Sequence, residues 1–123
     1  MTTGRDVVIL SGARTPTGRF EGQLSKVTAA ELGGVAIRAA VERSGIAVTD
    51  VDEVLMGCVL AGGQGQAPGR QAAIKAGIPP TIGATTINKV CGSSIKSTAI
   101  AAQAIRAGEA DCLVSGGMEN MYL

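Results

Sequence analysis

In the stretch Ile87-Asn88-Lys89-Val90-Cys91-Gly92-Ser93-Ser94, a β-branched strand pattern ends and an alanine-rich helical pattern begins. This junction places the Cys91 thiol at the amino end of the predicted helix, where backbone N–H groups without helical partners and the helix dipole favour a thiolate. The thiolate is the nucleophilic form of cysteine. The stretch therefore predicts a strand–turn–helix unit of an α/β fold, with Cys91 as the candidate nucleophile.

Strand and helix patterns alternate along the rest of the chain. Apolar and β-branched runs predict strands over residues 7–10, 54–60, 85–88 and 111–115. Helical patterns bounded by capping and turn residues cover residues 28–44, 68–76 and 94–107. The order β-α-β-α-β-α-β predicts a layered fold with a mostly parallel sheet and helices on both faces.

The helix over residues 28–44 carries clear start and stop signals. Thr28 with Glu31 three residues later forms a capping box, and Gly45 is the expected end of the helix. We expect its inner face to be formed by Leu32, Val35, Ala36 and Ala39.

Composition excludes several classes of function. Of the 123 residues, 46% are hydrophobic and 17% charged, and Lys plus Arg exceed Asp plus Glu by 11 to 10. The basic residues are scattered, which argues against nucleic-acid binding. No apolar run approaches the roughly 20 residues needed to span a bilayer, and no secretory signal is visible. We expect a soluble protein of the cytoplasm or an organellar matrix that contacts neither nucleic acid nor membrane.

The three cysteines differ in their surroundings. Cys58 and Cys112 lie within apolar strand patterns and fit buried structural roles, whereas Cys91 has turn and helix-start neighbours. Their odd number and wide spacing favour neither a disulfide framework nor a metal site. The chain contains no histidine, so the usual base partner of a catalytic cysteine is not among these residues.

Two glycine-rich turns permit more than one interpretation. The run 63–69 follows a strand and precedes a helix, but its spacing is Gly-x-Gly-x-x-x-Gly and no acidic residue follows at the distance of a dinucleotide fingerprint, so we interpret it as a loop. The pair Gly116-Gly117 indicates close passage of another backbone or a substrate, while Met118 and Met121 also fit ordinary strand-exit residues.

Three runs together resemble the thiolase family, and within it the acetyl-CoA acetyltransferases. They are residues 11–20 (Ser-Gly-Ala-Arg-Thr-Pro-Thr-Gly-Arg-Phe), residues 87–97 around Cys91, and residues 115–121 (Ser-Gly-Gly-Met-Glu-Asn-Met). The resemblance extends over the full length of the chain. It implies two similar domains in an enzyme of about three times this length, so that residues 1–123 form a partial amino-terminal domain. A final strand, a loop segment and a carboxy-terminal domain would lie outside it.

The resemblance also implies a chemistry. Cys91 would attack an acyl-CoA thioester and carry the acyl group, and its backbone N–H would contribute to the oxyanion hole. A second acetyl-CoA would then condense with the acyl group, or CoA would cleave a 3-ketoacyl-CoA in reverse. The activating histidine, a second cysteine and most CoA contacts would come from the missing portion or from a companion chain. Ser94 stands where the family often has glycine.

Coenzyme A thioester is then a substrate, with no tightly bound cofactor and no metal expected. By analogy the strand over residues 85–88 would pair across a two-fold axis in a homodimer or homotetramer. Two alternatives stay open: a ketoacyl-synthase-type condensing enzyme, and a non-catalytic scaffold or acyl-CoA binding module if the chain functions alone.

Overall fold

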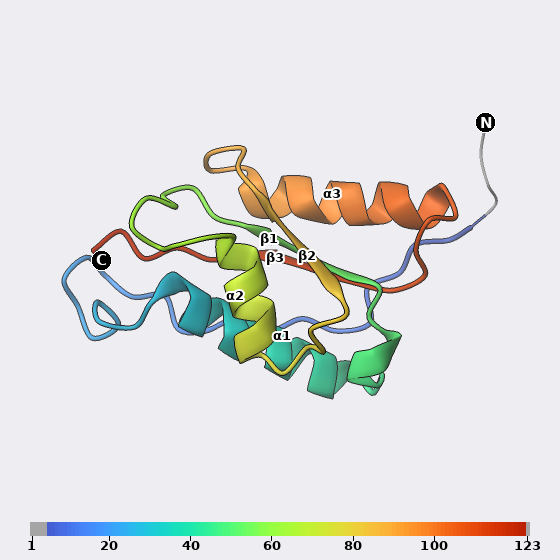
Figure 1. Ribbon diagram of the computed structural model, residues 1–123, viewed down its shortest axis with the longest axis horizontal. Coiled ribbons are helices and arrows are strands. Elements are labelled where there is room, and N and C mark those ends of the chain that lie inside the picture. Colours follow the sequence, from blue (N-terminus) through green and yellow to red (C-terminus); the bar gives the residue numbers. More distant parts are fainter. Residues whose placement is uncertain (1–4, 123) are drawn as a thin grey trace.

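Three parallel strands form the centre of the computed structural model, which describes residues 5–122 (Figure 1). They are β1 (Glu53–Gly57), β2 (Gly83–Ile87) and β3 (Leu113–Gly117), in the order β2-β1-β3. Glu53 lies opposite Gly83 on one side and Leu113 on the other, so the strands run in register to their ends. The predicted parallel sheet is confirmed.

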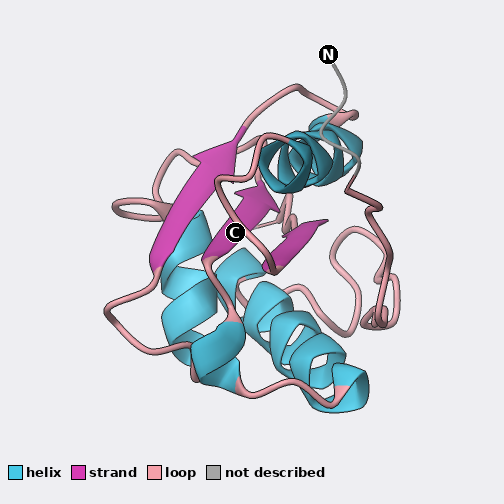
Figure 2. Cartoon of the chain, turned by 90° about the vertical axis from the view of Figure 1, so that its right-hand side faces the viewer, coloured by secondary structure: helices cyan, strands magenta, loops and turns pink. Residues whose placement is uncertain are grey.

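Helices cover both faces of this sheet. One face carries α1 (Ala29–Ser44) and α2 (Pro68–Lys75), and the other carries α3 (Ser93–Arg106), as Figures 1 and 2 show from two directions. A short 3-10 helix, Val48–Asp50, leads into β1. The three predicted helices are confirmed to within one residue at each end. None of the helices found between residues 5 and 122 combines the length and the apolar character needed to cross a membrane.

The ends of α1 are those the sequence predicts. The Thr28 hydroxyl accepts a hydrogen bond from the backbone N–H of Glu31 (3.1 Å), and the Glu31 carboxylate accepts one from the N–H of Thr28 (2.8 Å). The Glu31 carboxylate accepts hydrogen bonds from the backbone N–H of Thr28, which has the larger effect, and from the Thr28 hydroxyl. These bonds hold the pKa of Glu31 below its usual range. Gly45 ends the helix with a left-handed φ of 79°.

The predicted inner face of α1 is wrong at Val35, and its other three residues are only half-buried. Val35 is 62% exposed, and the buried side of the helix instead consists of Ala29, Ala30, Gly33, Gly34, Ile37 and Val41. A Cβ on Gly34 would lie 3.0 Å from the Cβ of Lys75, and one on Gly33 would lie 2.5 Å from the sulfur of Met118. The helix turns its glycines inward because they allow this close approach to α2 and to the segment after β3.

The predicted strand over residues 7–10 is also wrong. Val8 is 68% and Ile9 84% exposed, and no described strand pairs with this segment. It is fastened by other bonds: Ser11 donates to the carbonyl of Ala40, and Arg5 pairs with Asp111. A cavity of about 560 Å³ separates it from β3, and a β-ladder requires neighbouring backbones about 4.8 Å apart.

The hydrophobic core lies between the sheet and the pair α1 and α2. Val54 and Met56 of β1 are buried there against Ala72 and Ala73 of α2 and Ile37 of α1. Small alanines on α2 let the helix pack closely on β1, which fixes the strand whose far end enters the site described next.

Candidate active site

The carboxyl ends of the three parallel strands meet at one edge of the sheet. The strands end at Gly57, Ile87 and Gly117, and α3 begins at this edge with Gly92 as its N-cap. In open parallel sheets, ligands bind outside the carboxyl ends of the strands. Cys91 lies in the turn between β2 and α3 and therefore belongs to the edge where a site is expected.

Two glycines bring the start of α3 directly onto the strand ends. A Cβ on Gly57 would lie 2.6 Å from the Cβ of Ser93, and a Cβ on Gly117 would lie 2.8 Å from that of Ser94. Such distances leave no room for any side chain at either glycine. The close passage that the pair Gly116-Gly117 indicates is therefore made, at Gly117, by the first turn of α3.

The turn that carries Cys91 is held in a strained conformation. Val90 has a φ of +50°, which is unusual for a β-branched residue and costs about 1–3 kcal/mol. Its N–H donates to Asn88 Oδ1 (3.0 Å), and its carbonyl accepts from the hydroxyl of Ser93 (2.6 Å). The same hydroxyl accepts from the N–H of Lys89 (2.8 Å). Hydrogen bonds from two side chains therefore fix the backbone that precedes Cys91.

A cavity of about 490 Å³ lies beside the exposed Cys91 side chain. Most of its walls are glycine, serine and apolar residues, and Glu119 is the acidic residue among them. The lining residues are Gly57, Val59, Leu60, Val90, Cys91, Ser93, Ser94, Gly117, Met118, Glu119 and Met121. A reactive side chain facing a largely apolar cavity is the arrangement of a site for an organic substrate.

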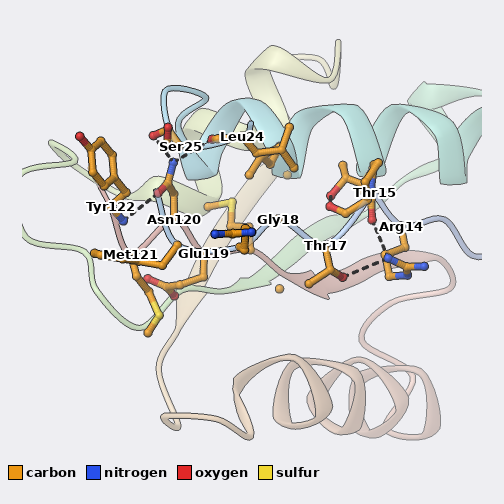
Figure 3. A pocket seen from close by; sticks show the side chains of 18 of the residues that line it. Arg14, Thr15, Thr17, Gly18, Leu24, Ser25, Glu119, Asn120, Met121 and Tyr122 are labelled. Atoms are coloured by element: carbon orange, nitrogen blue, oxygen red, sulfur yellow. Dashed lines mark hydrogen bonds between the residues drawn. The ribbon is translucent and has the colours of Figure 1, made fainter. Parts of the chain in front are cut away.

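The segment after β3 is anchored on both of its sides. The Glu119 carboxylate accepts hydrogen bonds from the backbone N–H groups of Val59 (2.8 Å) and Leu60 (3.0 Å). The next side chain, Asn120, points the opposite way and donates to the carbonyls of Ser25 (3.0 Å) and Val27 (2.6 Å), as Figure 3 shows for Ser25. Successive side chains therefore fasten this segment to two different parts of the molecule.

A second cavity, of about 450 Å³, lies on the other side of the same segment (Figure 3). The loop that contains Arg14, Thr15 and Thr17 forms its opposite wall. Arg14 donates to the carbonyl of Thr15 (2.9 Å) and to the hydroxyl of Thr17 (3.1 Å), which folds the loop on itself. The run 11–20 that the sequence singles out and the run 115–121 thus share one cavity.

The other two cysteines are less accessible than Cys91. Burial raises the pKa of the Cys58 thiol, the hydrogen bond from Gln64 opposes this, and the Glu119 carboxylate raises the pKa further. Burial also raises the pKa of Cys112, with the carboxylates of Asp52 and Asp50 adding to the effect. Within residues 5–122, no group of three or more His, Cys, Asp or Glu side chains is placed to hold a metal ion.

Sequence reasoning missed the contribution of Glu119, Asn88 and Ser93. Their side chains look like ordinary polar turn residues, because their partners lie in other loops or in the next turn of the chain. One signal was available for Glu119: an acidic residue two positions after the end of a parallel strand lies close to the neighbouring strand ends.

Comparison with known proteins places these features in a family. Residues 7–122 match the family model described as "Thiolase, N-terminal domain". The chain is 58% identical over 94% of its length to an acetyl-CoA acetyltransferase of Cupriavidus necator, and 56% identical over 94% to a cytosolic acetyl-CoA acetyltransferase of Gibberella zeae. Similar proteins also include mitochondrial forms.

The fold matches a solved structure as well. The Acat5 thiolase of Ascaris suum in complex with coenzyme A superposes with a TM-score of 0.89 at 40% sequence identity, over 92% of this chain. The chain spans 30% of the length of that protein and 30% of the Cupriavidus protein.

Proposed function

The chain belongs to the thiolase family, and on that premise we propose that it supplies the cysteine nucleophile, Cys91, of an acetyl-CoA acetyltransferase. The observation that carries the proposal is the position of Cys91: its exposed side chain borders a largely apolar cavity at the carboxyl edge of a parallel sheet, just before α3. The amino end of a helix stabilises the negative charge of a thiolate.

The proposed reaction has two steps. The Cys91 thiolate attacks the thioester carbonyl of acetyl-CoA, the carbon–sulfur bond to CoA breaks, and CoA leaves as a thiolate that takes up a proton. In the second step another acetyl-CoA loses an α-proton to a base, and its carbanion attacks the acetyl-cysteine carbonyl. Acetoacetyl-CoA forms and the Cys91 thiolate is released. The reverse direction cleaves a 3-ketoacyl-CoA with free CoA.

Backbone donors at the turn suit the developing negative charge. The carbonyl oxygen of the bound acyl group becomes an oxyanion in both steps, and hydrogen-bond donors aimed at it lower the barrier. We assign the backbone N–H of Cys91 to this role, because it lies at the amino end of α3 next to the attacking sulfur.

The base and most of the coenzyme A contacts are assigned to a further segment or a companion chain. None of the 123 residues is a histidine, and proton transfer at neutral pH is most often performed by histidine. The relatives, more than three times as long as the matched part, support this division.

We further propose that β2 forms the interface of a homodimer, itself compatible with a tetramer. β2 is at the edge of the described sheet and leaves one side without a neighbouring strand among residues 5–122. Its exposed residues include Gly83 and Thr85. Pairing two such edges removes a site for unwanted association.

Cellular location is open between two compartments. Similar proteins include a cytosolic and a mitochondrial form. We propose the cytoplasm, the location printed in the name of the similar Gibberella zeae protein.

The test uses the complete protein, with whatever segment or companion chain accompanies residues 1–123 in its source. Incubation with acetyl-CoA alone is expected to release free CoA and to form acetoacetyl-CoA, which a ketoacyl-synthase-type enzyme would not do. Cys91→Ala is expected to abolish the reaction, whereas Cys58→Ala and Cys112→Ala retain it. Turnover by the Cys91→Ala protein would overturn the assignment.

Intact mass under denaturing conditions separates catalysis from a scaffold or binding role. A single species of 12.3 kDa that is soluble, monomeric and cooperatively folded favours a binding module. A longer chain or a companion chain favours the enzyme.

A further inference from the structure

Backbone hydrogen bonds join the three strands as far as one residue beyond β1 and β3, and side chains join them after that point. The last backbone bonds between them are those from the N–H of Cys58 to the carbonyl of Ile87 (3.0 Å) and from the N–H of Met118 to the carbonyl of Gly57 (2.9 Å). One residue further on, the backbones separate, and two polar side chains take over the connection.

Val59 is the residue at which these two side chains meet. Its N–H donates to Glu119 Oε1 (2.8 Å), while Leu60 donates to Oε2 of the same carboxylate (3.0 Å). The carbonyl of Val59 accepts from Asn88 Nδ2 (3.2 Å). Both backbone groups of one residue are thus used to connect the loop after β3 with the loop after β2.

The connection continues to the residue before Cys91. Asn88 Oδ1 accepts from the N–H of Val90 (3.0 Å). Val90 has the left-handed φ of +50° that sets the direction of the backbone just before Cys91. A continuous path of hydrogen bonds therefore runs from Glu119 through Val59 and Asn88 to Val90. The path begins 28 residues after Cys91 in the sequence and ends next to it in space.

We propose that Glu119 is a positioning residue for Cys91: its carboxylate fixes the loop at Val59, and that loop fixes the cysteine turn through Asn88. The inference rests on the proposed function, because it concerns the efficiency of acyl transfer to Cys91. A carboxylate that accepts from two adjacent N–H groups forms charge-assisted bonds, which are stronger than neutral ones. Small errors in the placement of a nucleophile cost large factors in rate.

Glu119→Gln is the sharpest single change. Glutamine has nearly the same shape, but it turns one acceptor into an NH2 donor that faces a backbone N–H, so one of the two bonds is lost. Asn88→Asp tests the next link, because it keeps the acceptor for Val90 and loses the donor to Val59. The matched control is Glu109→Gln, the same substitution at an exposed residue beyond the other end of α3.

The experiment measures kcat and KM of acetyl transfer, with thermal melting, on the complete protein. Glu119→Gln and Asn88→Asp are each expected to lower kcat about 10- to 100-fold with KM nearly unchanged, while Glu109→Gln matches the parent. The kcat of the double variant is expected to be hardly lower than that of the worse single variant, because both substitutions interrupt the same series of hydrogen bonds.

Two results overturn the proposal. One is a Glu119→Gln protein that melts and turns over like the parent. The other is a double variant whose loss equals the product of the two single losses. If Glu119→Gln does not fold, Asn88→Asp decides the question, and a normal kcat in it overturns the path. Failure of the proposed function is distinguishable, because there Cys91→Ala itself retains activity.

Discussion

Gly57 and Ser93 are in contact at a distance that excludes every side chain except hydrogen at position 57: a Cβ placed there would lie 2.6 Å from the Cβ of Ser93. Gly57 is the last residue of β1, and Ser93 is the first of α3. Because the Ser93 hydroxyl also accepts from the N–H of Lys89 and donates to the carbonyl of Val90, this contact determines where the cysteine turn lies on the sheet.

Gly57→Ala should therefore disturb the site as well as the fold. Overpacking of this kind costs about 1–3 kcal/mol, and relief requires α3 to move away from β1. We expect a lower midpoint of urea unfolding together with slower acyl transfer. Gly62→Ala is the control, because a Cβ at Gly62 meets nothing within 4 Å. Equal stability of the two variants would contradict the expected clash.

Val90→Gly should separate stability from activity. Glycine adopts a positive φ without strain, and Val90 is 65% exposed, so little apolar burial is lost. Relief of about 1–3 kcal/mol of strain outweighs the extra freedom that glycine gives the unfolded chain, about 0.5–1 kcal/mol. We expect an unchanged or higher melting temperature and slower acyl transfer, since the turn loses its stiffness.

Val35→Gly provides the comparison for this change. Val35 is similarly exposed, at 62%, but lies within α1, where glycine destabilises by about 1 kcal/mol relative to alanine and by a smaller amount relative to valine. If Val90→Gly lowered the melting temperature as much as Val35→Gly, the backbone at Val90 would not be strained.

The three cysteines should react with iodoacetamide in a fixed order. Cys91 is exposed and should be alkylated first, as peptide mass spectrometry at pH 7.5 would detect. Cys58 is buried and its pKa is raised by that burial, so it stays a protonated thiol and should react last. Raising the pH toward 9 should speed the reaction at Cys112, whose pKa is also raised. Modification of Cys58 before Cys91 would contradict this order.

Asp52 should make stability depend on pH in the acid range. Its carboxylate accepts from the backbone N–H of Asp111 (2.7 Å) and of Cys112 (3.1 Å), and these bonds lower its pKa in the folded protein. The folded state therefore binds this proton less tightly than the unfolded state. The stabilisation is present above the unfolded pKa of about 3.9 and is lost as the pH falls through the lower folded value.

Asp52→Asn isolates this contribution. The variant should be less stable than the parent at pH 7, and the difference in urea midpoint should shrink as the pH falls from 5 to 2. Asp6→Asn, a change at another exposed carboxylate, should show no such trend. A difference between parent and Asp52→Asn that stays constant with pH would contradict the assignment.

Much of the fold could be predicted because its signals are local. The capping box at Thr28, the left-handed Gly45 and the strand–turn–helix at Cys91 each lie within a few residues of sequence. The segment over residues 7–10 was mistaken for a strand because a β-branched run reports conformation and says nothing about a hydrogen-bonding neighbour. The face of α1 was misplaced because glycines count as gaps in a hydrophobic pattern, although they mark the closest packing.

The site divides in the same way. The position of Cys91 before α3 follows from local sequence, and its catalytic role stays a prediction. The hydrogen bonds of Glu119 could not be predicted, because its partners Val59 and Leu60 precede it by about 60 residues. Hydrogen bonds between residues so far apart in sequence can be recognised only once the arrangement of the parallel strands is known.

The path from Glu119 to Val90 also has a consequence for folding during protein synthesis. Translation delivers Cys91 well before Glu119, and chains begin to fold from the amino terminus while they are being made. During that interval, α1, α2 and the first two strands can assemble, but the loop at Val59 lacks the carboxylate that holds it. We therefore expect the nascent protein to carry a Cys91 thiol that is exposed to solvent before its position is fixed. The cysteine turn is then among the last parts of this domain to reach its final conformation.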